Sequence, residues 1–292
     1  MVRFGATAGR VTLRGRNADT AFEADVVLAA GDVRRAQLNG DRLASADRLR
    51  HELRTLVFTP DRLAVVKGAP ATRRAYLDRS LGRLTPARAA LPVEYAASVG
   101  QRNACLRRLR AGSSSRDALQ PWTERVVALG EALVHARTQV AATLAEPYAK
   151  LADQLGLASA TLGYEGETPT VAELDTRLDR DLDRGLTGAG PHLHDVRLDA
   201  NGRELRSFGS QGEQRIAVLA LVLAEAEVLQ SRTGASPLVL LDDVLSELDG
   251  DRRRALATIV ETGGQTVITA TAAAALPAVP AQALAVSPGA VR

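Results

Sequence analysis

Two adjacent carboxylates, Asp242 and Asp243, directly follow an aliphatic run, residues 238–241. Such a short apolar run predicts a strand buried in a parallel sheet, and ligands bind at the carboxyl ends of such strands. Carboxylates there need a metal ion or hydrogen-bond donors. Their spacing suits a nucleotide triphosphatase, in which one acid holds Mg²⁺ and its neighbour orients or deprotonates the attacking water. The alternative interpretation is that both acids only cap the turn after the strand.

A second candidate site is the stretch SQGEQ, residues 210–214, which opens a predicted helix. A hydroxyl, a glycine that allows close approach and the free N–H groups of a helix N-terminus together form an anion site suited to phosphate. The alternative is a plain helix cap, with Ser210 as N-cap and Glu213 completing a capping box. Both interpretations hold together, because phosphate binding and capping use the same free donors.

The elements that must position these sites change character along the chain. Residues 1–60 alternate apolar and polar side chains, which predicts β-structure with a hairpin at Asn39-Gly40. From residue 61 the apolar spacing becomes helical, and most of residues 86–157 is predicted to be long helix. Pro121 is expected to begin one of these helices, and Pro147 to end or kink the helix that contains it.

The second half of the chain returns to mixed structure. A charged helix is predicted over residues 171–186, and Asn201-Gly202 predicts another hairpin. From Ser210 onward the order becomes loop, buried helix, buried strand, helix and a second buried strand, QTVITAT. We therefore expect a discontinuous α/β core formed by residues 1–60 and 188–292, interrupted by a helical insertion over residues 61–187.

Composition limits the class of protein. The 292 residues are 46% hydrophobic and 24% charged, which excludes disordered and collagen-like classes. The net charge of +3 comes almost entirely from arginine, because Lys67 and Lys150 are the only lysines. This balance permits a nucleic-acid partner without arguing strongly for one, because GC-rich coding also produces abundant arginine. The single cysteine, Cys105, excludes an intramolecular disulfide, and with no apolar run of membrane-spanning length we expect a cytoplasmic protein.

Taken together, the loop that opens a helix, the strand ending in two acids and the Ser-Glu-Leu-Asp turn at residues 246–249 resemble an ABC-type ATPase head. Within that superfamily the chain resembles the RecF family of DNA replication and repair proteins. The resemblance rests on LVFTPDRLAVVKGAPATRRAYLD at residues 56–78, YAASVGQRNACLRRLR at residues 95–110, GPHLHD at residues 190–195 and GSQGEQR at residues 209–215.

The sequence departs from that family in two places. It contains no Gly-x-x-x-x-Gly-Lys-Ser/Thr phosphate loop, because Lys67 precedes Gly68 and Lys150 precedes Leu151. The family's first strand, phosphate loop and first helix are thus missing, which implies a fragment or mis-called start, a lost ATP site, or a separate chain that supplies the part. We expect the missing strand beside the strand that ends at Asp242, and poor stability of the chain alone. The superfamily's histidine after the last strand is also absent, with Ala270 or Thr271 in its place.

The resemblance implies a mechanism in which two protomers sandwich two nucleotides. Asp243 would be the catalytic acid and Asp242 the ligand of Mg²⁺. Ser246 and Asp249 would lie in a dimer loop. The nucleotide would be contacted in trans by Ser210, Gln211, Gly212 and Gln214.

The resemblance also implies partners. ATP binding would close a homodimer on duplex DNA near single-strand gaps, where the mediators RecO and RecR help to place RecA, and the protein would support the SOS response in association with the nucleoid. ATP and Mg²⁺ would act only if the missing segment is supplied. Candidate DNA contacts, each of which could instead belong to a solvated basic face, are Arg73, Arg74, Arg102, Arg107, Arg108 and Arg110.

Other functions remain open. A non-hydrolysing DNA-binding or scaffold relative would explain the missing phosphate loop, whereas an ABC transporter subunit would not explain residues 56–78 and 95–110. His192, His194 and Asp195 could suggest a metal site, but the family's own GPHLHD segment is the better explanation.

Overall fold

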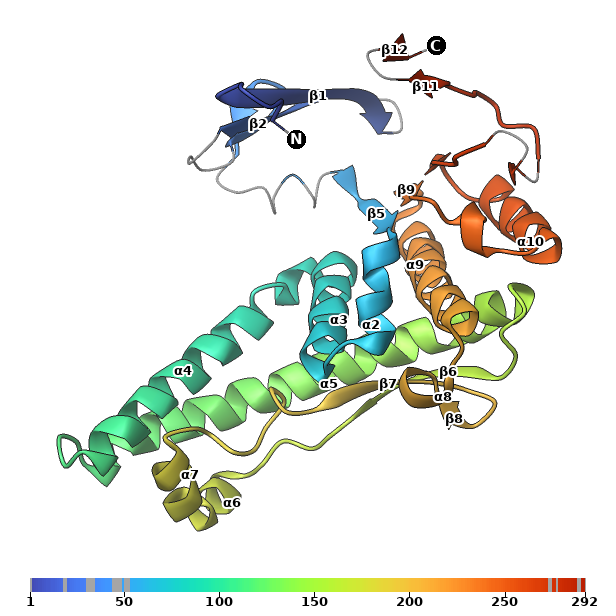
Figure 1. The fold of residues 1–292 in the computed structure, drawn as a ribbon. Coiled ribbons are helices and arrows are strands. Elements are labelled where there is room, and N and C mark those ends of the chain that lie inside the picture. Colours follow the sequence, from blue (N-terminus) through green and yellow to red (C-terminus); the bar gives the residue numbers. More distant parts are fainter. Residues whose placement is uncertain are drawn as a thin grey trace.

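The computed structural model describes residues 2–17, 20–29, 35–43, 49, 53–272, 275–276, 278–287 and 290–291, which form several small sheets and a long helical arm (Figure 1). The helices are α2 (Ala64–Lys67), α3 (Pro70–Leu84), α4 (Leu91–Arg110), α5 (Arg116–Gln154), α6 (Val171–Thr176), α7 (Leu178–Arg184), α8 (Leu205–Phe208), α9 (Gln211–Thr233) and α10 (Gly250–Glu261). Short 3₁₀ turns are η1 (Pro60–Leu63), η2 (Pro86–Arg88) and η3 (Leu245–Glu247). The strands are β1 (Ala8–Asn17), β2 (Thr20–Ala29), β3 (Arg35–Leu38), β4 (Asp41–Arg42), β5 (Thr55–Phe58), β6 (Ala160–Glu165), β7 (Asp195–Ala200), β8 (Arg203–Glu204), β9 (Leu238–Leu241), β10 (Thr266–Ile268), β11 (Val286–Ser287) and β12 (Ala290–Val291).

The N-terminal region is an antiparallel sheet with the strand order β1-β2-β3-β4. Asn39 and Gly40, with φ angles of 53° and 87°, form the turn between β3 and β4, which confirms the predicted hairpin. The hairpin predicted at Asn201-Gly202 is confirmed in the same way between β7 and β8. Residues 18–19, 30–34, 44–48 and 50–52 of the predicted β-region lie outside the described residues.

A parallel sheet carries the predicted acid pair. Its order is β10-β9-β5, with Leu241 opposite both Phe58 and Ile268. The expectation of a missing strand beside β9 is therefore wrong, because β5 and β10 occupy both of its edges. The prediction of β10 as a buried strand is also wrong, since Val267 is 46% exposed. In the described part of the chain β10 is the outer strand of this sheet.

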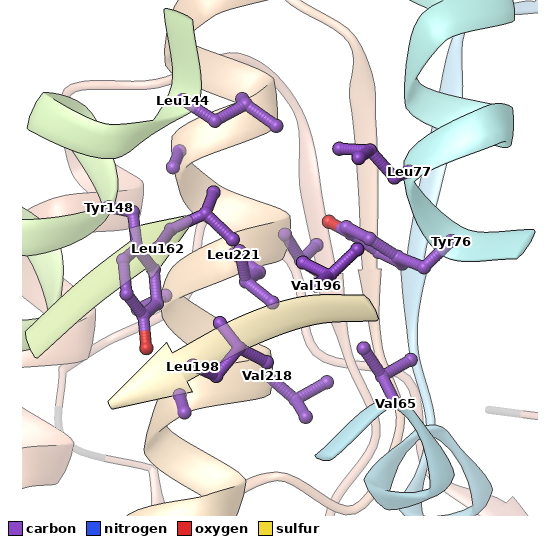
Figure 2. Close-up of a cluster of buried hydrophobic side chains, with 14 of the residues drawn as sticks. Val65, Tyr76, Leu77, Leu144, Tyr148, Leu162, Val196, Leu198, Val218 and Leu221 are labelled. Carbon is purple, nitrogen blue, oxygen red and sulfur yellow. The ribbon is translucent and has the colours of Figure 1, made fainter. Parts of the chain in front are cut away.

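Helix α9 crosses the main hydrophobic core. Its residues from Ile216 to Ala224 are all buried, which confirms the prediction of a helix enclosed on most sides. Figure 2 shows its side chains between α5, β7 and α3, in a cluster that includes Val218, Leu221, Leu144, Tyr148, Val196, Leu198, Tyr76 and Leu77. The N-terminus of α9 is therefore positioned by the buried part of the same helix.

This core crosses the predicted boundary between insertion and ATPase core. Strand β6, inside the predicted insertion, pairs antiparallel with β7, which puts Leu162 opposite Leu198. Helices α3 and α5 also contribute to the cluster that surrounds α9. The inner part of the insertion thus shares its packing with the rest of the molecule.

The outer part of the insertion is the helical arm. Helices α4 and α5 pack along one another, and α7 closes a small separate cluster of Leu106, Leu119 and Leu178 (Figure 1). The charged helix predicted over residues 171–186 is divided at Arg177 into α6 and α7.

The prediction that Pro121 begins a helix of the arm is wrong. Helix α5 begins at Arg116, where the Ser115 side chain caps it, so Pro121 lies inside the helix. Pro147 does not end the helix, because buried Tyr148 and Leu151 extend the packed face beyond the proline. The kink that is the other expectation for Pro147 stays a prediction. Packing along this face outweighs the loss of one backbone hydrogen bond at each proline.

Candidate functional site

The two acids emerge at the carboxyl end of β9, as the sequence predicts. The Asp242 amide donates to Phe58 O at 2.9 Å, which fixes the backbone of this residue to β5. The next residue, Asp243, has a φ of 49°, a left-handed conformation that aspartate tolerates better than most residues. Ser246 Oγ donates to Asp243 O at 3.0 Å and holds the turn from its far side.

Sequence reasoning missed Thr269 in this site. Its Oγ1 donates to Asp242 Oδ1 at 2.6 Å and accepts from the Asp243 amide at 3.0 Å. Because Thr269 immediately follows β10, the parallel pairing of β9 and β10 could have identified it as the neighbour of Asp242. The family pattern instead indicated Ala270 or Thr271, which occupy the place of the superfamily's histidine.

The oxygen ligands at this edge fit Mg²⁺. In the described part of the chain, no arginine or lysine lies within ion-pair distance of Asp242 or Asp243, and no group of three His, Cys, Asp or Glu side chains could hold a metal ion by itself. Mg²⁺ is commonly held by one or two carboxylates, waters and substrate phosphate rather than by a cage of protein ligands. Asp242 could supply one carboxylate, which leaves the remaining positions to water and phosphate.

The tip of α9 combines both interpretations of the SQGEQ stretch. Ser210 Oγ accepts from the Glu213 amide at 3.2 Å, and Glu213 Oε2 accepts from the Ser210 amide at 2.7 Å, which completes the capping box. The first two helical amides, those of Gln211 and Gly212, have no intrahelical acceptor by helix geometry. The Ser210 hydroxyl donates to the Glu213 carboxylate, so the donors left free at this tip are the two amides. These donors fit a phosphate.

Glu213 adds a negative charge beside those donors. Hydrogen bonds from the Ser210 amide and hydroxyl lower the pKa of its carboxyl group, with a smaller contribution from Arg252. Arg252 lies on α10, and a side chain at Gly212 would meet its Nη1 at 3.9 Å. One acidic and one basic group therefore flank the exposed amides.

Gln214 does not take the role expected for it. Its side chain is buried, with 3% exposure, and Nε2 donates to Leu205 O at 2.8 Å. The residue ties α9 to α8 instead of facing solvent. A trans contact from Gln214 to a nucleotide is therefore ruled out in this conformation.

The predicted dimer-loop residues are engaged locally. Ser246 holds the Asp243 carbonyl, and Asp249 Oδ1 accepts from the Arg252 amide at 2.9 Å as the N-cap of α10. The Asp249 side chain is 58% exposed, and its Oδ2 lies 3.4 Å from Arg252 Nη1. Their participation in a dimer stays a prediction.

Two of the six arginine candidates are buried structural residues, so their assignment to DNA is wrong. Arg73 forms a two-pronged ion pair with Asp195, through Nε to Oδ1 at 2.7 Å and Nη2 to Oδ2 at 2.6 Å. Arg102 is fully buried and donates from Nη1 to Asp181 Oδ2 at 2.8 Å and to Thr187 Oγ1 at 2.9 Å. Neither guanidinium is exposed to a phosphate backbone.

The other four arginines differ among themselves. Arg74 is partly buried, and its Nη1 donates to His194 O. Arg107, Arg108 and Arg110 are exposed at the end of α4, where Arg110 Nη1 also donates to Asp183 O at 2.9 Å. The end of the arm is therefore where candidate phosphate contacts remain.

Both histidines of GPHLHD form hydrogen bonds with tyrosines. His192 Nε2 lies 2.9 Å from Thr187 O, which accepts only, so the ring must carry its proton on Nε2. His192 Nδ1 then accepts from Tyr95 Oη at 2.8 Å, and His194 Nδ1 lies 3.0 Å from Tyr164 Oη. Burial lowers the pKa of both histidines.

The parallel sheet with its terminal acids, the helix opened by SQGEQ and the helical insertion define an ABC-type ATPase head. No family model matches the chain. Among curated proteins, it is 38% identical to the DNA replication and repair protein RecF of Heliobacterium modesticaldum over 81% of this chain and 68% of that one. It is 35% identical to the RecF protein of Myxococcus xanthus over 93% of this chain and 75% of that one. The chain belongs to the RecF family.

Solved structures agree with this assignment. The recombination mediator protein RecF of the RecFOR pathway, solved with ATP, superimposes with a TM-score of 0.80 at 25% identity, over 93% of this chain and 77% of that one. A second structure of RecF, with ATPrS, has the same TM-score at 24% identity and supports the fold alone. No helix in the described ranges is both long and apolar enough to cross a membrane.

Proposed function

We propose that this protein is an ATP-controlled DNA-binding protein of replication and repair, which clamps duplex DNA beside single-strand gaps as a homodimer. Its partners would be the mediators RecO and RecR and, indirectly, RecA, with a supporting role in the SOS response on the cytoplasmic nucleoid. The observation that carries the proposal is family membership over most of the chain, in a molecule that keeps both the acids after β9 and the open N-terminus of α9.

The residues divide the work between two protomers. Asp242 would hold Mg²⁺, and Asp243, whose backbone is fixed by Thr269 and Ser246, would orient the attacking water. From the other protomer, Gln211 and Gly212 would donate their amide hydrogens to phosphate oxygens, and the Ser210 hydroxyl would turn from Glu213 to join them. Mg²⁺ supplies charge neutralisation when it is bound.

The missing phosphate loop favours a second candidate function. The printed sequence has no Gly-Lys-Ser/Thr, so it lacks the backbone nest and the lysine that commonly hold the phosphates of ATP. A DNA-binding or scaffold protein that dimerises through the same surfaces without hydrolysis would keep every other feature. The proposed division into residues 1–60 with 188–292 and an insertion over 61–187 serves either function, with the arm as the outer part.

Nucleotide calorimetry and DNA anisotropy on the purified chain separate the two candidates. With the missing phosphate-loop segment supplied, the main proposal expects ATP to bind and to tighten binding to a gapped duplex relative to ADP. Asp243→Asn should lower any turnover at least a hundredfold while DNA binding persists. Asp251→Asn, an exposed aspartate on α10, is the matched control and should change neither. DNA binding that ignores ATP would support the scaffold, and absence of DNA binding would refute both.

A further inference from the structure

Thr269 contacts both acids of the site at the end of β9. One hydroxyl contacts the side chain of Asp242 and the backbone of Asp243 at the same time. The directions of both bonds are fixed by chemistry, because a carboxylate only accepts and an amide only donates. The hydroxyl hydrogen therefore goes to Asp242 Oδ1, and an oxygen lone pair accepts from the Asp243 N–H.

The strand pairing makes this contact a fixed feature of the sheet. Ile268 lies opposite Leu241, and the Thr269 amide donates to Leu241 O at 3.0 Å, one step before the acids. On its other side, Asp242 is held by the hydrogen bond from its backbone amide to Phe58 O. The acid pair is thus tied to β5 through its backbone and to β10 through Thr269.

The two acids receive different restraints from this arrangement. For Asp242, the hydroxyl engages Oδ1, and no described residue donates a hydrogen bond to Oδ2. For Asp243, the restraint acts on a backbone in the left-handed region, held at the N–H by Thr269 and at the C=O by Ser246. No described residue donates to the Asp243 carboxylate. These hydrogen bonds restrain the Asp242 carboxylate and the Asp243 backbone. At least one carboxylate oxygen of each residue receives no hydrogen bond from a described residue and can bind a ligand.

We propose that Thr269 is the positioning residue of this site, which orients the Asp242 carboxylate toward a divalent cation and holds the left-handed turn at Asp243. Only serine among the other residue types offers a hydroxyl at the same distance from the backbone. The part of the proposal that concerns the cation rests on the proposed function, whereas the part that concerns the turn does not. Two different measurements therefore test it.

The first measurement is amide hydrogen exchange at Asp243, followed by NMR in the full chain without nucleotide. Thr269→Val keeps the size and branching of the side chain but removes the hydroxyl, so exchange at this amide should become about fivefold faster. Thr269→Ser should retain most of the protection. Thr271→Val is the matched control, because no hydrogen bond is described for its side chain and it follows the same strand.

The second measurement is Mn²⁺ binding, followed by the EPR signal of the free ion. Thr269→Val should weaken binding about fivefold, Thr269→Ser should bind nearly as the parent chain does, and Asp242→Asn should lose most binding. Unchanged exchange and unchanged Mn²⁺ binding in Thr269→Val would overturn the proposal, as would equal losses in the Val and Ser variants.

Failure of the proposed function gives a different pattern. If Asp242→Asn binds Mn²⁺ as well as the parent chain, the metal role of Asp242 is refuted, and exchange at Asp243 alone decides whether Thr269 holds the turn. If Asp242→Asn loses Mn²⁺ while Thr269→Val retains it, the metal site stands and the positioning role of Thr269 is refuted.

Discussion

The helical arm and the carboxyl end of β9 both carry charged side chains, but these charges differ in burial and in pairing. In the arm, Arg102 and Asp181 are almost completely buried and neutralise one another. At the end of β9, Asp242 and Asp243 have no ion-pair partner among the described residues. Buried, paired charge specifies packing, and exposed, unpaired charge is available for a ligand. Burial and pairing of a charged side chain therefore distinguish a structural residue from a candidate site residue, which the residue type alone does not.

The largest expected effect breaks the buried pair. Arg102→Met should lower the free energy of unfolding by about 3–5 kcal/mol, because it leaves Asp181 buried without a counter-charge. Urea unfolding followed by circular dichroism measures this loss. The double variant Arg102→Met/Asp181→Leu should recover much of it, because apolar residues of similar volume can replace a buried pair. A variant of unchanged stability but weaker DNA binding would return Arg102 to the interface.

A smaller effect is expected from the exposed arginines at the end of α4. Replacing Arg107, Arg108 and Arg110 by Ala should weaken binding to duplex DNA about tenfold, and should reduce the slope of log affinity against log salt by about one for each lost phosphate contact. The free energy of unfolding should change by less than about 1 kcal/mol, since all three residues are exposed and the bonds from Arg107 to Gly185 O and from Arg110 to Asp183 O lie near the surface. An unchanged salt slope would show that this end of the arm is only a solvated basic face.

The sequence predicted elements better than it predicted exposure. Short-range patterns identified β9, α9 and both Asn-Gly hairpins, because strand period, helix period and turn chemistry act over a few residues. The structural role of Arg102 could not be predicted from the sequence, because its partner Asp181 is distant in sequence and contacts it only when α7 packs on α4. Thr269 was missed for a related reason, because its contact depends on the pairing of β9 with β10.

Acid should weaken the inner end of the arm through its histidines. Burial lowers the pKa of His192 below its usual 6.5, so the unfolded chain binds a proton more readily than the folded one. Above pH 6.5 this histidine leaves the free energy of unfolding unchanged. As the pH falls below 6.5, the free energy of unfolding decreases, and it stops decreasing once the pH is below the pKa of the folded state. Urea unfolding should therefore show a lower free energy of unfolding at pH 5.5 than at pH 7.5.

The histidine origin of this loss has its own control. His192→Asn keeps a polar side chain that can accept from Tyr95 but does not titrate, so the stability of this variant should depend less on pH than that of the parent chain. His194 is also buried and responds in the same direction, so some dependence should persist. Equal pH dependence in the variant and the parent chain would contradict the assignment.

The smallest expected effect concerns Glu213 at the tip of α9. Its carboxylate accepts from the Ser210 amide at 2.7 Å, which places a negative charge at the very tip that is proposed to meet phosphate. Glu213→Gln keeps a side-chain oxygen for the capping box and removes that charge, so phosphate or ATP affinity in calorimetry should rise about twofold to fivefold at low salt. Because Arg252 offsets part of the charge, Arg252→Gln should shift the affinity in the opposite direction. If neither variant changes affinity, anions do not approach this tip, and the comparison between buried and available charge would then rest on the acids of β9 alone.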